Sequence, residues 1–302
     1  MLAQLAARDF RNLEPLSWRP APGSHLLLGG NGAGKTSLLE AVYVLATTRS
    51  FRAAQIGDCA RHGAGSFHVQ GEIDTDRRAT LEVGWMDGQR VRALNGKVTP
   101  LAEHLGVLPV VAWTAAAEAE VLVGAPKARR RFLDRGVVGI RPGALEVLAA
   151  SGLPFPTIEL HYRPSPADGL EGQETIARAL DRVADRERRR QMPLLGPQRD
   201  ELEILWGPHE IRRVASAGER KALSLMLLAA HGRVMEEAGR PPLYLLDDMD
   251  AELAPPTVNA VWGIFRGASQ LFATSNRPQV WLTLDVGTVW EMERGELRLL
   301  SE

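Results

Sequence analysis

The stretch HLLLGGNGAGKTSLLEAVYVLA, residues 25–46, decides the fold. Its first part, HLLLG at 25–29, is a short apolar run that predicts a strand leading directly into a glycine-rich loop. Beyond the loop, the periodicity of TSLLEAVYVLA predicts a helix with one apolar face, formed by Leu38, Leu39, Val42 and Leu45. A strand, a glycine loop and a helix in this order are typical of a phosphate-binding loop.

The loop has the pattern G-x-x-x-x-G-K-[ST], and a chance glycine turn has no reason to lie between a strand and a helix. Its glycines let the backbone curl so that N–H groups point at a phosphate, and the start of the helix adds a partial positive charge. We expect Lys35 to reach the β- and γ-phosphates of ATP and act in catalysis, and Thr36 to offer its hydroxyl to Mg²⁺. The residues predicted to bind the nucleotide here are Gly29, Asn31, Gly32, Ala33, Gly34, Lys35, Thr36 and Ser37.

An acidic pair follows the apolar run of LYLLDD at 243–248. An ATPase with this loop needs a carboxylate on a neighbouring strand to hold Mg²⁺. Asp247 is the predicted metal ligand, and Asp248 is the predicted catalytic residue that orients or activates the attacking water. The alternative is a plain turn or helix cap after a buried strand, a use that suits two adjacent aspartates poorly.

A second serine-glycine turn occurs in SAGERKALSLM at 216–226. Ser216 and Glu219 fit a capping box, which by itself needs no ligand. However, the order of glycine loop, S-x-G-E turn and acidic strand looks like the ATP-binding-cassette class. In that class two heads pair head to tail, and each such turn meets the γ-phosphate on the other head. The resemblance therefore predicts an ATP-dependent homodimer in which the nucleotide is also bound by Ser216, Gly218 and Glu219.

Further segments resemble the RecF family of bacterial DNA replication and repair ATPases. The matching segments are DFRNL at 9–13, the stretch 29–52, GAPKARRRFLD at 124–134, LLGPQRDEL at 194–202, ASAGERKALSLML at 215–227 and LLDDMDAEL at 245–253. This resemblance implies an ATP-dependent protein that binds single-stranded and duplex DNA at gaps or junctions. It also implies slow hydrolysis, and recombinase loading together with recombination mediator proteins.

The chain departs from the RecF pattern at several places. Gln198 stands where the family has His, Ala254 stands where it usually has Asp, and residues 116–119 replace a Pro-Glu-Asp-Leu segment. The segment between 134 and 196 is much shorter than the helical arm of typical members. These departures leave open a degenerate scaffold that does not hydrolyse ATP. The ATPase subunit of a membrane transporter is a further alternative, which the DFRNL opening disfavours.

The predicted fold class is α/β, an ABC-type P-loop ATPase head with a mixed sheet, a β-meander and a reduced helical arm. The head is expected at 1–125 and 194–302, with the arm inserted at 126–193. The predicted elements are the meander at 66–97, strands at 107–113, 241–248 and 269–276, a linker-like stretch at 139–172, and an amphipathic helix at 174–192 with Ile176, Leu180 and Val183 on one face.

The composition predicts a cytoplasmic protein that has no contact with a membrane. The 302 residues carry a net charge of −1, so DNA binding would need a local basic patch. The candidates are RERRR at 186–190 and RRR at 129–131, which are otherwise solvated helix faces. The single cysteine, Cys59, excludes an intrachain disulfide, and no apolar run has the length of a membrane helix. The histidines show no metal-ligand spacing, so Mg²⁺ is the one metal expected.

Overall fold

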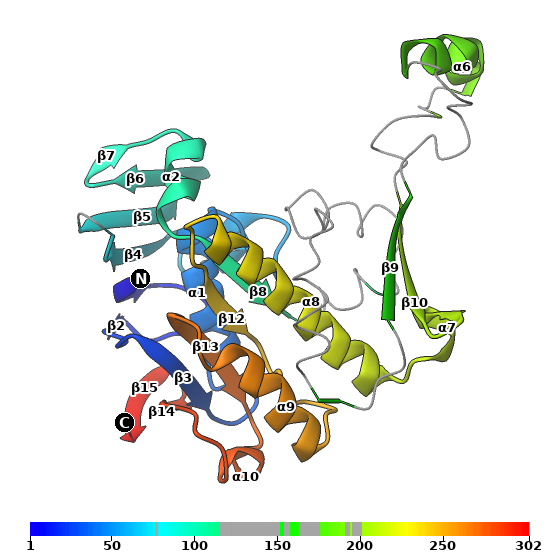
Figure 1. Ribbon diagram of the computed structural model, residues 1–302. Coiled ribbons are helices and arrows are strands. Elements are labelled where there is room, and N and C mark those ends of the chain that lie inside the picture. Colours follow the sequence, from blue (N-terminus) through cyan, green and yellow to red (C-terminus); the bar gives the residue numbers. More distant parts are fainter. Residues whose placement is uncertain are drawn as a thin grey trace.

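The computed structural model describes residues 1–75, 78–114, 122, 152–153, 158–163, 176–190, 194 and 201–301. Within these ranges one mixed sheet carries the glycine loop and the acidic strand (Figure 1). Its strand order is β15-β14-β3-β13-β12-β8. The strands are β15 (Glu296–Ser301), β14 (Thr288–Glu293), β3 (Gly23–Leu28), β13 (Gln270–Ser275), β12 (Leu243–Leu246) and β8 (Val110–Trp113). All neighbours are parallel except the edge pair β14 and β15, so the carboxyl ends of β3, β13 and β12 meet at one edge.

Helices cover both faces of this mixed sheet. Helix α1 (Lys35–Thr47) packs on one face, against Leu27, Leu245 and Phe272. The opposite face is covered by α8 (Ala217–Glu237) and α9 (Pro255–Phe265). Because neighbouring side chains on a strand alternate between faces, the strands from β14 to β8 supply apolar residues to both cores.

A second six-stranded sheet packs on the other side of α1. All its strands are antiparallel, in the order β2-β1-β4-β5-β6-β7. They are β2 (Leu16–Trp18), β1 (Leu2–Arg8), β4 (Phe67–Ile73), β5 (Ala79–Met86), β6 (Gln89–Leu94) and β7 (Lys97–Val98). At Gly71 a Cβ would lie 2.4 Å from the side chain of Leu45, so only glycine lets α1 approach this closely. The predicted meander at 66–97 is confirmed.

A separate sheet of three strands packs against α8. Its order is β11 (His209–Glu210), β10 (Glu201–Trp206) and β9 (Ile158–Arg163), and the short helix α7 (Ile211–Val214) follows it. Ile204, Trp206 and Ile211 pack against Leu223 and Leu227, so α8 contributes to two cores. Helix α6 (Ile176–Arg190) lies apart from the two six-stranded sheets (Figure 1).

Three sequence predictions need correction. Helix α1 is buried on nearly all sides and not on one face, because a sheet lies on either side of it. The strand expected at 107–113 begins only at Val110, since 101–107 form helix α2 (Leu101–Val107) and Pro109 has no N–H to donate. The stretch 139–172, expected to be linker-like, contains β9, whose hydrogen-bonding partner β10 is distant in sequence.

The other predicted elements that the structure describes agree with expectation. The strands predicted around 25–29, 241–248 and 269–276 are β3, β12 and β13, and the helix predicted at 174–192 is α6. Val183 of that helix is buried, as predicted. The helix begun by RRRFLD at 129–134 lies outside the described residues. Among the helices that the structure describes, none is long and apolar enough to cross a membrane.

Candidate nucleotide-binding site

The loop between β3 and α1 needs glycine at two motif positions for different reasons. A Cβ at Gly29 would lie 2.3 Å from the carbonyl oxygen of Met292 on β14, which leaves no room for a side chain. Gly34 has φ 117°, a backbone conformation that other residues rarely adopt. The first constraint comes from a neighbouring strand and the second from the loop's own backbone, and together they make the loop curl tightly at the start of α1.

The start of α1 is left open. Its N-cap is Gly34, which forms no side-chain cap, and the first turn contains no acidic residue. The first backbone N–H groups of a helix have no partner within the helix, and they carry the positive end of its dipole. This arrangement suits a phosphate group.

Lys35 lies folded across the loop and is 5% exposed. Its ammonium donates hydrogen bonds to the carbonyl oxygens of Gly29 at 2.9 Å and Gly30 at 3.1 Å. The cation therefore sits within the curl of the loop, where an anion held by the helix start would meet it.

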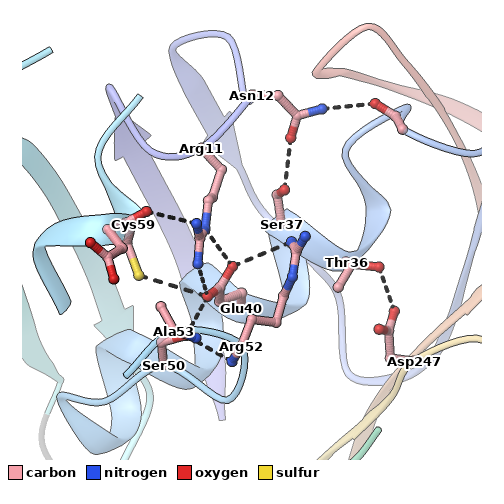
Figure 2. A network of polar contacts seen from close by, with 12 residues as sticks. Arg11, Asn12, Thr36, Ser37, Glu40, Ser50, Arg52, Ala53, Cys59 and Asp247 are labelled. Carbon is pink, nitrogen blue, oxygen red and sulfur yellow. Dashed lines mark hydrogen bonds and ion pairs between the residues drawn. The ribbon is translucent and has the colours of Figure 1, made fainter. Parts of the chain in front are cut away.

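Thr36 and the acidic strand are in direct contact. The Thr36 hydroxyl donates to Asp247 Oδ1 at 2.9 Å (Figure 2). The Thr274 hydroxyl at the end of β13 donates to the same oxygen at 2.9 Å. Burial raises the pKa of Asp247, an effect that these two hydrogen bonds oppose and the neighbouring Asp248 increases. A partly buried carboxylate beside a hydroxyl is the oxygen donor set that Mg²⁺ prefers, so these residues fit the metal.

Asp248 occupies the turn that follows β12. Its φ of 46° is unusual for a residue with a side chain, and its N–H donates to the Thr274 hydroxyl at 2.7 Å. The next helix, α9, starts beyond Ala254 without a side-chain cap. The aspartate pair therefore does not cap that helix, so of the two structural alternatives only the turn agrees with the structure.

A pocket of about 590 Å³ opens beside the loop. Eight of the predicted site residues meet there, namely Asn31, Gly32, Ala33, Gly34, Lys35, Thr36, Ser37 and Asp248. Gly29 and Asp247 touch the same site through Lys35 and Thr36. The rest of the lining is Arg11, Asn12, Arg52, Asp58, Ala60 and His62.

A buried carboxylate organises the part of the lining that the motifs did not predict. Glu40 of α1 is fully buried and accepts hydrogen bonds from Arg11 at 2.9 and 2.7 Å, and Arg52 lies 3.5 Å from it (Figure 2). Asn12 bridges the loop, accepting from the Ser37 hydroxyl at 2.7 Å and donating to the carbonyl of Gly32 at 2.8 Å. In the sequence, DFRNL and RSFR marked these residues only through family resemblance.

The second serine-glycine turn, residues 216–219, is called the signature turn from here on. It lies outside the pocket beside the glycine loop. Ser216 caps α8: its hydroxyl accepts from the Glu219 N–H at 3.3 Å, while the Glu219 carboxylate accepts from the Ser216 N–H at 2.8 Å and hydroxyl at 2.7 Å. These two hydrogen bonds from Ser216 lower the pKa of Glu219. A Cβ at Gly218 would lie 3.3 Å from the carbonyl of Glu252. Among the described residues, the pocket lining includes none from this turn.

Several segments that the sequence marked as candidates fall outside the described residues. They are the segments 116–119, 129–131 and 195–200, the last of which includes Gln198. The arginines at 186 and 188–190 lie on α6 and are exposed. Within the part of the chain that the structure describes, no group of three or more His, Cys, Asp and Glu could hold a metal.

Comparison with known proteins gives consistent results. Residues 1–295 match the family described as RecF/RecN/SMC N terminal domain. A DNA replication and repair protein RecF of Anaeromyxobacter sp. (strain Fw109-5) is 32% identical, with 84% of this chain and 86% of that protein covered. One of Moorella thermoacetica is 30% identical, with 99% and 97% covered.

Solved structures agree in fold. The structure of the recombination mediator protein RecF with ATP is similar at a TM-score of 0.77 and 20% identity, with 99% of this chain and 97% of that chain covered. An Smc head bound to the C-terminal winged-helix domain of ScpA is similar at a TM-score of 0.69 and 19% identity, with 100% and 98% covered.

Proposed function

The chain belongs to the RecF family and has the fold of an ABC-type ATPase head, and from this premise we propose that it is an ATP-dependent DNA-binding protein of DNA replication and repair. One observation carries the ATP-dependent part of the proposal. The Thr36 hydroxyl and the Asp247 carboxylate are 2.9 Å apart, although the two residues are 211 positions apart in the sequence. This contact joins the phosphate-binding loop to the acidic strand, as an ATPase with Mg²⁺ requires.

The residues predicted for phosphate, metal and water have distinct roles in this proposal. The open start of α1 and the ammonium of Lys35 hold the phosphates. Thr36 and Asp247 hold Mg²⁺, which when bound neutralises charge that develops on the phosphates. Asp248, which lines the pocket beside them, orients the attacking water and accepts its proton.

The signature turn supplies the second half of the site in a head-to-tail dimer. Ser216, Gly218 and Glu219 lie outside their own pocket, which supports a role at the nucleotide of a second copy. ATP would then hold two heads together, and hydrolysis would be slow because each site is complete only after assembly. Ala254, which stands where the family usually has Asp, supports the alternative of a scaffold that binds ATP without hydrolysing it.

DNA binding is proposed for the arginines of α6. Arg186, Arg188, Arg189 and Arg190 are exposed at the end of one helix, and a cluster of exposed arginines suits phosphate contacts that do not read sequence. The DNA expected is a single strand, a duplex or their junction, and the protein partners expected are recombination mediators.

The test is ATP-dependent sizing of the protein with and without gapped DNA, together with single-turnover ATP hydrolysis. We expect a monomer without nucleotide, a dimer with ATP and Mg²⁺, hydrolysis, and DNA affinity that falls with salt by about 0.9 log units per log unit for each phosphate contact. Neutralising Arg188, Arg189 and Arg190 should flatten that dependence. A protein that binds ATP but never hydrolyses it would be the scaffold, and one that binds no DNA in either state would contradict the repair function.

A further inference from the structure

Lys221 is a buried lysine in the first turns of the signature helix α8. Only 4% of it is exposed. Its ammonium donates a hydrogen bond to the carbonyl oxygen of Asp248 at 2.9 Å and lies 4.5 Å from the centre of the Trp113 ring. A lysine is rarely buried to this extent, because removing its ammonium from water is costly unless the group is well paired. The position therefore requires an explanation beyond packing.

The aromatic ring that contacts this ammonium is bonded back to the same helix. The Trp113 indole N–H donates to the Ser224 hydroxyl at 2.8 Å, and that hydroxyl donates to the carbonyl of Lys221 at 2.8 Å. The end of β8 and the first turns of α8 are thus held as one unit. The lysine has little freedom to move away from the turn that follows β12.

That turn is held on both sides at Asp248. The N–H of Asp248 donates to Thr274, and its carbonyl accepts from Lys221. The residue adopts φ 46°, which costs conformational energy unless the surroundings impose it. An aspartate side chain is short, so the position of its backbone decides where the carboxylate points.

We infer that Lys221 is a positioning residue for ATP hydrolysis. It fixes the backbone of Asp248, and so directs this carboxylate into the pocket where the attacking water must lie. The inference rests on the proposed function, since it takes Asp248 to serve hydrolysis. Lys221 also links two sites. Helix α8 begins at the turn expected to meet the partner's nucleotide, and Lys221 joins this helix to Asp248 in the chain's own site.

The test separates the rate of hydrolysis from ATP binding. Lys221→Met keeps the apolar stem and removes the ammonium. We expect single-turnover hydrolysis to fall by about tenfold to a hundredfold, while the ATP dissociation constant stays within about twofold of wild type. ATP should still assemble the dimer, and the dimer should persist longer because the bound ATP is hydrolysed more slowly. We expect the same longer-lived dimer for Asp248→Asn. Lys97→Met, at the exposed lysine of β7, is the matched control and should change none of these.

Two further variants show whether Lys221 acts through Asp248. Lys221→Arg keeps a cation and should recover part of the rate. Lys221→Met combined with Asp248→Asn should hydrolyse no more slowly than Asp248→Asn alone. If the methionine variant does not fold, the arginine variant decides on its own: a reduced rate at unchanged ATP affinity supports the role.

An unchanged rate in the variants that fold would overturn the role. So would a loss of rate matched by an equal loss of ATP affinity and of melting temperature, since that result indicates a purely structural lysine. A wild-type protein that binds ATP without hydrolysing it would overturn the proposed hydrolysis first. The role of Lys221 fails by itself only when the wild type hydrolyses ATP and the variants match it.

Discussion

Two helices of this chain begin at a glycine-containing turn, and their starts differ. Helix α1 begins after Gly34, which supplies no cap, and its first turn has no acid. Helix α8 begins after Ser216, where a complete capping box occupies the start with the chain's own side chains. The first turn lies at the pocket and the second lies outside it.

This difference separates two ways of using a helix start. The open start of α1 can accept a phosphate without breaking any side-chain cap. The start of α8 is stable without a ligand, so a phosphate arriving there must displace the Ser216 hydroxyl from the Glu219 carboxylate. A capped start on the surface is suited to a nucleotide that arrives bound to another molecule, since the helix must remain stable in the monomer.

The largest effect is expected at the open start. Lys35→Ala should weaken ATP binding by at least about a hundredfold, because its ammonium is the cation held within the loop. Lys35→Arg should keep part of the binding but stop hydrolysis, since a planar fork does not replace a compact ammonium. Binding of a fluorescent ATP analogue and phosphate release measure the two effects. Hydrolysis at the wild-type rate in the alanine variant would show that the nucleotide binds elsewhere.

At the capped start the expected effect depends on assembly. Ser216→Arg should leave ATP affinity of the monomer within about twofold, because Ser216 does not line its own pocket. It should abolish ATP-dependent dimerisation and lower hydrolysis by about a hundredfold, because a long cation replaces the small group that must meet the partner's γ-phosphate. Light scattering with a non-hydrolysable ATP analogue measures the dimer. Ser216→Ala is the milder control, and a Ser216→Arg protein that dimerises and turns over would reduce the turn to a helix cap.

A smaller effect is expected on stability at the metal-binding end of the pocket. Burial raises the pKa of Asp247, so the proton is held more tightly in the folded chain than in the unfolded chain. The corresponding stabilisation is complete below the unfolded pKa and is lost as pH rises through the folded pKa. Asp247→Asn should therefore raise the melting temperature of the nucleotide-free protein at pH 7 by about 1 to 3 °C, and the gain should vanish in acid.

Thermal unfolding followed by circular dichroism between acid and neutral pH measures this gain. Asp181→Asn, at an exposed aspartate of α6, is the matched control and should show no such dependence. Asp247→Asn should also lose the stabilisation that ATP with Mg²⁺ gives the wild type. A lower melting temperature at pH 7 would mean that the hydrogen bonds from Thr36 and Thr274 outweigh burial.

The smallest effect is expected at Glu219. Glu219→Gln can keep the capping box but removes a negative charge beside the expected γ-phosphate, so the ATP-dependent dimer should tighten by about two- to fivefold. Glu219→Ala removes the reciprocal half of the cap and should destabilise the chain by about 0.5 to 1 kcal/mol. Analytical ultracentrifugation and thermal unfolding separate the two results. A Glu219→Gln dimer that is weaker than the wild-type dimer would argue that the negative charge itself is needed.

The sequence predicts the parts of the site that depend on local geometry. The glycine loop, the acidic strand and the capping box each have short-range patterns, and each is found at the predicted residues. Thr274 was missed, although it lies near the end of a predicted strand beside the acidic strand, and the polar ends of parallel strands meet at one edge. Lys221 and Glu40 gave no such signal, because their importance comes from partners that only the folded chain brings near.

In the fold, too, elements with a regular local pattern were predicted and elements that depend on distant partners were not. The meander and the mixed-sheet strands β3, β12 and β13 have regular apolar patterns and were predicted, and β8 was predicted with a start that is too early. Strand β9 was not, because its pairing with β10 joins segments separated by α6. Strands β14 and β15 were also missed, although a turn at Gly295 with φ 86° joins them. β15 is the edge strand and β14 lies next to it, and both have partly polar sequences, so their apolar pattern is weak.

The central claim is that each ATP site is built from the open helix start of one molecule and the capped start of another. Mixing Lys35→Ala protein with Ser216→Arg protein tests it directly, because only a mixed dimer can pair an intact loop with an intact signature turn. Each variant alone should be almost inactive, and the equimolar mixture should recover hydrolysis to a substantial fraction, about a quarter, of the wild-type rate if heads pair at random. A mixture no more active than the sum of the separate variants, at concentrations where wild type dimerises, would contradict the claim.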